Sequence, residues 1–109
     1  MAEDAYVEYV KELFSDFGVV RSRKMFGGYG IYFDDRMVAL IADSRLYLKV
    51  DAQTRPQFER EGCEPFVYDG KGKPMAMSYY SVPDDALDAP TRFKPWAQLA
   101  YAAALRVKR

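Results

Sequence analysis

The chain has 109 residues, of which 50% are hydrophobic and 16% aromatic, the size and composition of one compact domain over residues 1–109. Sixteen basic residues balance sixteen acidic ones, so the net charge is zero and any contact with a polyanion needs a local basic patch. The sequence has no histidine and a single cysteine, Cys63, which excludes an internal disulfide and histidine-based catalytic pairs.

The first segment predicts an amphipathic helix that ends near Gly18. Glu3 and Asp4 are favourably placed at its positive end, and glycine is a frequent helix stop. The apolar positions recur at helical spacing: Tyr6, Val7, Val10, Leu13, Phe14 and Phe17.

From Arg23 onward the pattern changes to that of strands. Three runs are expected, at residues 27–33, 37–42 and 46–50, separated by the short acidic turns 34–36 and 43–44. Turns this short imply antiparallel neighbours.

A second helix and a second hairpin are predicted next. Thr54 can cap the helix, Gln57 three residues later completes a capping box, and Gly62 ends the helix. Strands are then expected at residues 65–68 and 75–82, on either side of a polar turn.

The last helix is predicted to begin near Thr91, because Pro95 is tolerated only close to a helix start. Its apolar face consists of Phe93, Trp96, Ala100, Ala103, Ala104 and Val107. The element order is therefore helix, three strands, helix, two strands, helix. We expect an α+β fold of two layers, with helices packed on an antiparallel sheet.

Three glycines crowd into the first predicted strand: Gly27, Gly28 and Gly30. A phosphate-binding loop would need a helix directly after the glycines, and here a strand follows. Each mid-strand glycine costs about 0.5–1 kcal/mol relative to alanine, so the cluster implies a geometric need. A bulge, or a helix crossing closely over Gly28 and Gly30, is the favoured interpretation.

Few residues suit catalysis. The acidic neighbour of Cys63 would raise the pKa of its thiol, which disfavours a reactive thiolate. The carboxylate pairs Asp34-Asp35 and Asp84-Asp85 could hold Mg²⁺ or exchange protons. Because the first pair lies in a predicted turn and the second at a helix start, we favour a structural role for both.

Basic residues form three scattered groups rather than one stripe: Arg21, Arg23 and Lys24; Lys71 and Lys73; Arg106, Lys108 and Arg109. No helix-turn-helix signature, zinc ligand set or RNA-recognition motif accompanies them in the sequence. Specific nucleic-acid binding is therefore not expected.

Six aromatic residues in predicted strands are candidates for a protein-contact surface: Tyr29, Phe33, Tyr47, Tyr68, Tyr79 and Tyr80. Strand alternation places some on each face of the sheet, and three helices need not cover both faces. Tyrosine is favoured at interfaces because it buries a large ring and keeps a polar tip. An exposed edge strand could also form a homodimer, and burial of all six in the core is the alternative.

Several motifs resemble the amino-terminal domain of the TfoX/Sxy family of competence regulators. They are Lys24-Met25-Phe26-Gly27-Gly28 with Gly30 in the same run, Leu46-Tyr47-Leu48-Lys49, Pro65-Phe66-Val67-Tyr68, and Tyr79-Tyr80 followed by Val82-Pro83. The resemblance covers almost the whole chain. It implies the element order given above and a link to transcriptional activation of DNA-uptake genes, and it supplies no catalytic residue.

The sequence thus predicts a non-catalytic regulatory or adaptor domain without a cofactor. Its expected partner is a protein, such as a transcription regulator or a polymerase component. No signal peptide opens the chain and no apolar run approaches the ~20 residues that span a bilayer, so we expect a cytoplasmic location without membrane contact. A small-molecule-binding or enzymatic domain on the same fold is the alternative.

Overall fold

The structure is a computed structural model that describes residues 2–25, 28–70 and 73–107, with side chains for 5–25, 28–67 and 78–107. The helices are α1 (Ala2–Leu13), α2 (Arg55–Arg60) and α3 (Pro90–Leu105), with short 3₁₀ helices η1 (Phe14–Asp16) and η2 (Asp84–Asp88). The strands are β1 (Arg21–Met25), β2 (Gly28–Phe33), β3 (Arg36–Ala42), β4 (Arg45–Lys49), β5 (Pro65–Gly70) and β6 (Lys73–Ser81).

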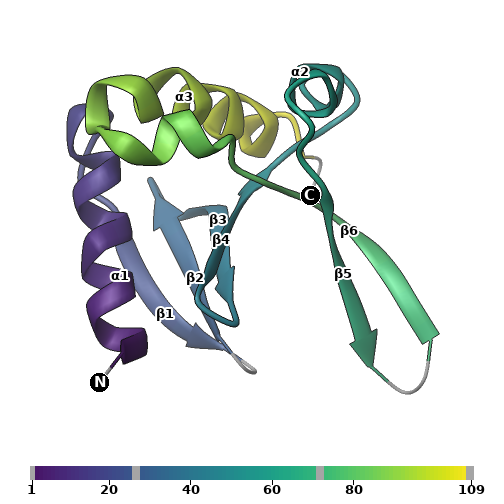
Figure 1. Cartoon of the computed structure of the whole chain (residues 1–109), viewed down its shortest axis with the longest axis horizontal. Coiled ribbons are helices and arrows are strands. Elements are labelled where there is room, and N and C mark those ends of the chain that lie inside the picture. Colours follow the sequence, from purple (N-terminus) through teal and green to yellow (C-terminus); the bar gives the residue numbers. More distant parts are fainter. Residues whose placement is uncertain (1, 26–27, 71–72, 108–109) are drawn as a thin grey trace.

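These six strands form one antiparallel sheet in the order β1-β2-β3-β4-β6-β5. Figure 1 shows α1 and α3 gathered over the strands β1 to β4, whereas the hairpin of β5 and β6 extends away from both helices. The predicted α+β fold, with helices packed on an antiparallel sheet, is confirmed.

The number of strands differs from the prediction. The segment around the glycines forms two strands rather than one, because β1 and β2 pair in a hairpin that sets Arg21 opposite Tyr32 and Met25 opposite Gly28. Four of the five residues of β1 are exposed. An exposed, charged edge strand lacks the apolar alternation by which strands are recognised in a sequence.

Two acidic turns connect the central strands, as expected. Asp34 and Asp35 join β2 to β3, and Asp43 and Ser44 join β3 to β4, all with φ between 52° and 61°. Positive φ at both central residues is the geometry of a type I′ turn, whose twist matches that of the flanking strands. The short side chain of aspartate tolerates this conformation better than most.

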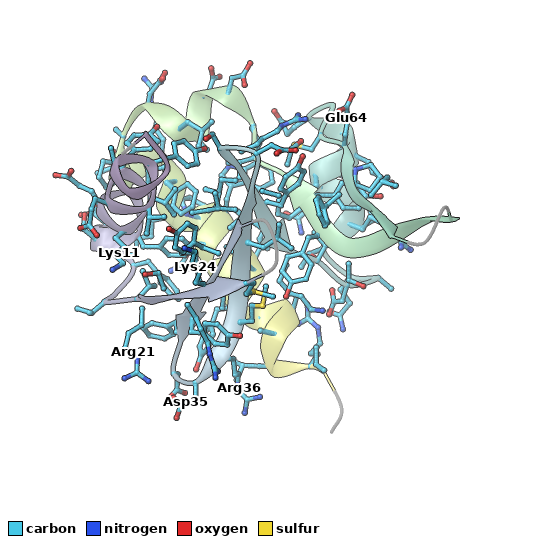
Figure 2. The ribbon with its side chains drawn as sticks, turned by 90° about the horizontal axis from the view of Figure 1, so that it is seen from below. Lys11, Arg21, Lys24, Asp35, Arg36 and Glu64 are labelled. Atoms are coloured by element: carbon cyan, nitrogen blue, oxygen red, sulfur yellow. The ribbon has the colours of Figure 1, made fainter. Side chains whose placement is uncertain are left out.

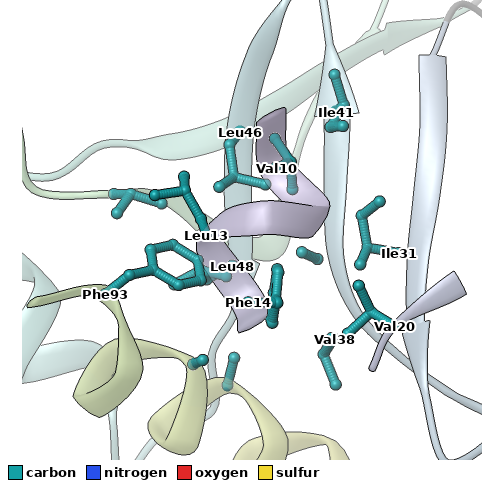
Figure 3. Packing of buried hydrophobic residues seen from close by; sticks show 14 of the residues in the cluster. Val10, Leu13, Phe14, Val20, Ile31, Val38, Ile41, Leu46, Leu48 and Phe93 are labelled. Carbon is teal, nitrogen blue, oxygen red and sulfur yellow. The ribbon is translucent and has the colours of Figure 1, made fainter. Parts of the chain in front are cut away.

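The hydrophobic core lies between the helices and one face of the sheet. Figure 3 shows Val10 and Leu13 of α1 and Phe93 of α3 facing strand residues that include Leu46 and Leu48. All of these side chains are buried. Burial of apolar surface is the largest favourable contribution to folding. The core therefore determines which face of the sheet packs against the helices.

The start of α2 is organised differently from the prediction. Asp51 Oδ1 accepts the backbone N–H of Thr54, and Thr54 Oγ1 accepts the backbone N–H of Asp51, both at 3.1 Å. This reciprocal pair is a capping box placed three residues before the expected one, and Thr54 makes no side-chain cap to α2. Gly62, with φ of 79°, follows the end of the helix as predicted.

The terminal helix begins at Pro90, close to the expected position, and Pro95 lies on its exposed side. Val107 was expected on the apolar face, but it lies beyond the helix end and is exposed, whereas Ala97 is fully buried.

Arg106 donates to both carboxylate oxygens of Asp51 and lowers the pKa of the Asp51 carboxyl to about 2. This pair ties the end of α3 to the end of β4.

Candidate interaction surface

The sheet has two faces, and only one of them is covered by the core helices. Ile31, Ala39 and Leu48 pair in a row across β2, β3 and β4 and are fully buried in the core. Tyr32 follows Ile31 along β2, and the strand period of two turns it to the opposite face. We call this second face the open face.

A bulge in β3 shapes the open face. Ile31 pairs with Ala39 and Tyr32 with Met37, so Val38 has no partner in β2. The extra residue allows Val38 and Ala39 both to be buried in the core while Met37 lies beside Tyr32 on the open face. Arg21 of β1, Tyr32 of β2 and Met37 of β3 therefore pair in one row across the edge of the sheet.

Gly28 and Gly30 both belong to the open face. A Cβ atom on Gly28 would lie 1.9 Å from the carbonyl oxygen of Ile41 in β3, and one on Gly30 would lie 2.8 Å from Met25 Sδ. The glycines therefore do permit a close approach. The approaching groups are a neighbouring strand and a methionine side chain rather than the helix that the sequence suggested. The pairing of β2 with β3 does contain a bulge, but it lies at Val38, opposite Ile31 and Tyr32, and not at the glycines.

Tyr79 and Tyr80 are adjacent in β6 and point to opposite faces. Tyr80 is part of the core, and its hydroxyl donates to Glu59 Oε2 at 2.9 Å. Tyr79 pairs with Lys49 on the open face and is only 9% exposed, and this burial, together with nearby Tyr32, raises its pKa to about 12. The Lys49 Nζ lies 5.1 Å from the centre of the Tyr79 ring.

Tyr47 is the predicted aromatic candidate that remains most accessible on the open face. It is half-buried, with the Phe66 ring centre at 5.0 Å and the Arg45 guanidinium at 5.5 Å. Tyr29 and Phe33 pack against the core instead. The structure thus brings Tyr47 and Tyr79 to one face and takes Tyr29, Phe33 and Tyr80 to the other.

The remaining predicted motif residues contribute less to this surface. Lys24 is exposed, but it pairs with Tyr29 and so lies on the face opposite to Arg23. Phe26 and Gly27 lie outside the described residues, as does the side chain of Tyr68.

Two hollows meet at Tyr32, and both are lined by Tyr32 and Asp35. One, of about 410 Å³, is completed by Arg21, Ser22 and Arg23. The other, of about 270 Å³, is completed by Arg36, Met37, Lys49, Tyr79, Ala104 and Val107. We call the two together the Tyr32 groove.

The Tyr32 groove is basic although the chain as a whole is neutral. Four cationic side chains line it against the single carboxylate of Asp35, namely Arg21, Arg23, Arg36 and Lys49. Arg21 pairs with Asp35 at 3.4 Å, and the other three make no ion pair among the residues described. Figure 2 shows Arg21, Asp35 and Arg36 gathered at one end of the sheet.

The electrostatics of Lys49 reflect its position in the groove. Partial burial lowers the pKa of its ammonium group, and the negative charge of the Asp51 carboxylate opposes this effect. A cation that has lost part of its hydration gains more from an anionic ligand than a fully solvated cation does. Lys49 is therefore a partly desolvated cation in the lining of the groove.

Sequence reasoning named Lys49 only as part of a family motif, and it did not single out Tyr32 or Met37 as surface candidates. Alternation along a strand puts Tyr32 on the same face as Gly28 and Gly30, so the sequence does contain part of the signal for this face. No local sequence pattern predicts the bulge in β3. None predicts the pairing of Lys49 with Tyr79 either, because it joins strands that are distant along the chain.

The catalytic candidates remain scattered. Burial raises the pKa of the half-buried Cys63, as does the nearby charge of Glu61 and Asp84. Asp34 lies in a turn, where it accepts a hydrogen bond from Tyr101 at 2.9 Å, and Asp84 opens η2. In the described part of the chain, no three residues of metal-ligating type cluster together.

Comparison with known proteins gives a consistent result. The family model of the TfoX N-terminal domain matches residues 12–104. The DNA transformation protein TfoX1 of Aliivibrio fischeri is 34% identical over 80 residues, which cover 73% of this chain and 36% of that protein. Protein Sxy of Escherichia coli is 27% identical over 77 residues, covering 71% and 36%.

The similarity to these relatives is limited to one part of them, because the chain spans little more than a third of the length of either. A 12.7 kDa protein of Spirochaeta aurantia, named for its position in the trpE 5′ region, is matched over nearly its whole length. It is 33% identical over 104 residues, which cover 94% of this chain and 84% of that protein. None of the helices described is both long and apolar enough to cross a membrane.

Proposed function

This chain belongs to the TfoX N-terminal domain family, and on that premise we propose that it is a non-catalytic regulatory or adaptor domain. It acts through protein contacts in transcriptional regulation of the competence type, and it works in the cytoplasm, where transcription takes place. Its contact surface is the open face of the sheet.

One observation carries this proposal. No core helix lies across the open face, although Ala104 and Val107 at the end of α3 line one of its hollows. On this face half-buried Tyr32 lies beside Arg23, Arg36 and Lys49, which make no ion pair among the described residues, and half-buried Tyr47 lies beside Arg45. Aromatic and arginine side chains are enriched at protein interfaces, whereas a purely solvated face needs neither. The guanidinium group of Arg45 lies over the Tyr47 ring and also forms an ion pair with Glu64.

Edge-to-edge dimerisation of β1 is disfavoured by charge. β1 is one edge of the sheet and carries Arg21, Arg23 and Lys24 in five residues. Antiparallel pairing of two copies of this strand would set like charges against each other, a device that natural proteins use to block edge association. The other edge, β5, carries the exposed Val67 and remains the candidate for a homodimer.

The proposal is tested by genetic complementation in the native host. Deletion of the gene should lower transcription of DNA-uptake genes, and the unaltered gene should restore it. A Tyr47→Ser variant that is present at the normal level and melts normally should restore it only weakly. Unchanged transcription after deletion would refute the regulatory role.

The alternative, a small-molecule-binding or enzymatic domain, predicts a different result. A thermal-shift screen of metabolites against the purified chain would then show a ligand that raises the melting temperature in proportion to its concentration. The regulatory proposal expects no such ligand. It expects a transcription regulator or polymerase component to be recovered with the protein, and to be lost with Tyr47→Ser.

A further inference from the structure

We infer that the Tyr32 groove binds an acidic, extended segment of a protein partner, in which carboxylates flank an aromatic or aliphatic residue. This inference rests on the proposed function, because it names the chemistry of the partner at the same open face. Its three supports are charge, the nature of the groove floor, and shape.

The charge of the groove selects an anion. Arg23, Arg36 and Lys49 face the two hollows without an ion-pair partner among the described residues, and Asp35 neutralises only Arg21. The guanidinium group forms paired hydrogen bonds to a carboxylate, which fixes both position and orientation. A segment with several carboxylates would satisfy the cations on both sides of Tyr32.

The floor of the groove is apolar between those cations. Tyr32 and Met37 are half-buried neighbours, and the Tyr79 ring lies beside them. Methionine adapts its shape to different ligands, and a tyrosine ring gives a large contact area at low entropic cost. An apolar side chain of the partner would lie on this floor while its flanking carboxylates engage the rim.

The shape favours a chain over a compact ligand. The two hollows, of about 410 and 270 Å³, adjoin at Tyr32 along the row that begins at Arg21. An extended peptide of several residues can reach both hollows, because they share Tyr32 and Asp35 as lining, whereas small-molecule sites usually enclose most of the ligand in one pocket.

A single-stranded nucleic acid fits less well. Bases are held on protein surfaces chiefly by stacking on free aromatic faces. Here the Tyr79 ring is already covered by Lys49, and the Tyr47 ring is flanked by Phe66 and Arg45.

The test titrates the purified chain with a fluorescein-labelled peptide, DEEFDEELDE, and follows backbone amide shifts by NMR. Controls are the same peptide with lysine in place of each acid and a labelled ten-residue oligothymidine. The variants are Arg23→Glu, which alters the groove, and Lys24→Glu, which makes the same charge change on the adjacent residue and the opposite face. Lys49→Gln is a second groove variant, and melting temperatures verify that all are folded.

Saturable binding of the acidic peptide, with shifts centred on Tyr32 and Lys49, is the expected result. Arg23→Glu should weaken it roughly tenfold and Lys24→Glu less than about threefold, because a rim charge acts mainly on the ligand beside it. The inference is overturned by absence of binding at millimolar peptide, by equal loss in the two variants, or by tighter binding of the oligothymidine at the same amides.

The outcome separates this inference from the proposed function. Failure to bind the peptide, combined with loss of DNA-uptake gene transcription in Arg23→Glu, would reject the acidic ligand and keep the regulatory face. Peptide binding combined with unchanged transcription after gene deletion would reject the regulatory function and keep the ligand chemistry.

Discussion

Adjacent residues of the same strands have opposite roles on the two faces of this sheet. Ile31 and Leu48 are fully buried under the helices, and their neighbours Tyr32 and Lys49 line a basic groove on the open face. The side chains buried under the helices are apolar, as packing requires. The open face combines cations, aromatic rings and methionine, a mixture that stability alone does not require.

The largest expected effect lies on the covered face. Phe93→Ala should lower the free energy of unfolding by about 3–5 kcal/mol, because it replaces a fully buried ring by a cavity. The centre of this ring lies 4.9 Å from the centre of the Phe14 ring. Urea denaturation measures this directly. A loss below about 1 kcal/mol would mean that the helix layer contributes far less to stability than the two-face account requires.

The two glycines of β2 sharpen the comparison within the open face. Gly28→Ala should destabilise the fold by about 2–3 kcal/mol, because its Cβ meets the rigid backbone of Ile41. Gly30→Ala should cost about 1 kcal/mol or less, since its Cβ meets side chains rather than backbone, and the nearest of them, Met25, is exposed and flexible. Equal melting temperatures for the two variants would contradict this difference.

Asp51 belongs to neither face and joins the end of β4 to α2 and α3. Asp51→Ala should cost about 1–2 kcal/mol, because it removes the capping box and the pair with Arg106. Asp51→Asn is the matched control, because it retains a capping oxygen and loses the charge. Chemical denaturation at pH 7 should rank the alanine variant below the asparagine variant.

The pH dependence of the Asp51 contribution has a definite sign. The pKa of its carboxyl is lowered from 3.8 to about 2 in the folded chain, chiefly by Arg106. A lowered pKa means that ionised Asp51 stabilises the fold above about pH 4, and that this stabilisation is lost as the pH falls through 4 toward 2. Unfolding free energies between pH 5 and 2 should therefore fall more steeply for the parent than for Asp51→Asn. Parallel curves would show that Arg106 does not hold the carboxylate ionised.

The smallest expected effect is a gain in stability. Ser44 has φ of 56° in the turn between β3 and β4 and is exposed. Ser44→Gly should raise the free energy of unfolding by up to about 1 kcal/mol, because glycine adopts positive φ without steric cost. A lower melting temperature for this variant would show that contacts of the serine side chain stabilise the fold by more than the positive φ of Ser44 destabilises it.

Much of the fold could be predicted because periodicity is local. The helical spacing from Tyr6 to Phe14 and the acidic turn at Asp34 and Asp35 each report on neighbouring residues, and the structure confirms both. β1 was not recognised as a separate strand, because an exposed edge strand has no apolar face.

The open face was predicted only in part. Strand alternation puts the adjacent Tyr79 and Tyr80 on opposite faces, but it could not show that Tyr79 would be buried beneath Lys49. The groove depends on the bulge at Val38 and on pairing between β4 and β6, which are distant along the chain. Such arrangements follow from tertiary packing, which residue spacing does not encode.

The most direct test of the central claim compares Arg23→Glu with Lys24→Glu in the native host. The two residues are adjacent, exposed and equally charged, but they belong to opposite faces of β1. The account predicts that Arg23→Glu lowers DNA-uptake gene transcription at unchanged protein level and melting temperature, whereas Lys24→Glu leaves it near the parent value. Equal transcription in the two variants, or transcription that simply follows melting temperature, would contradict a functional role for the open face.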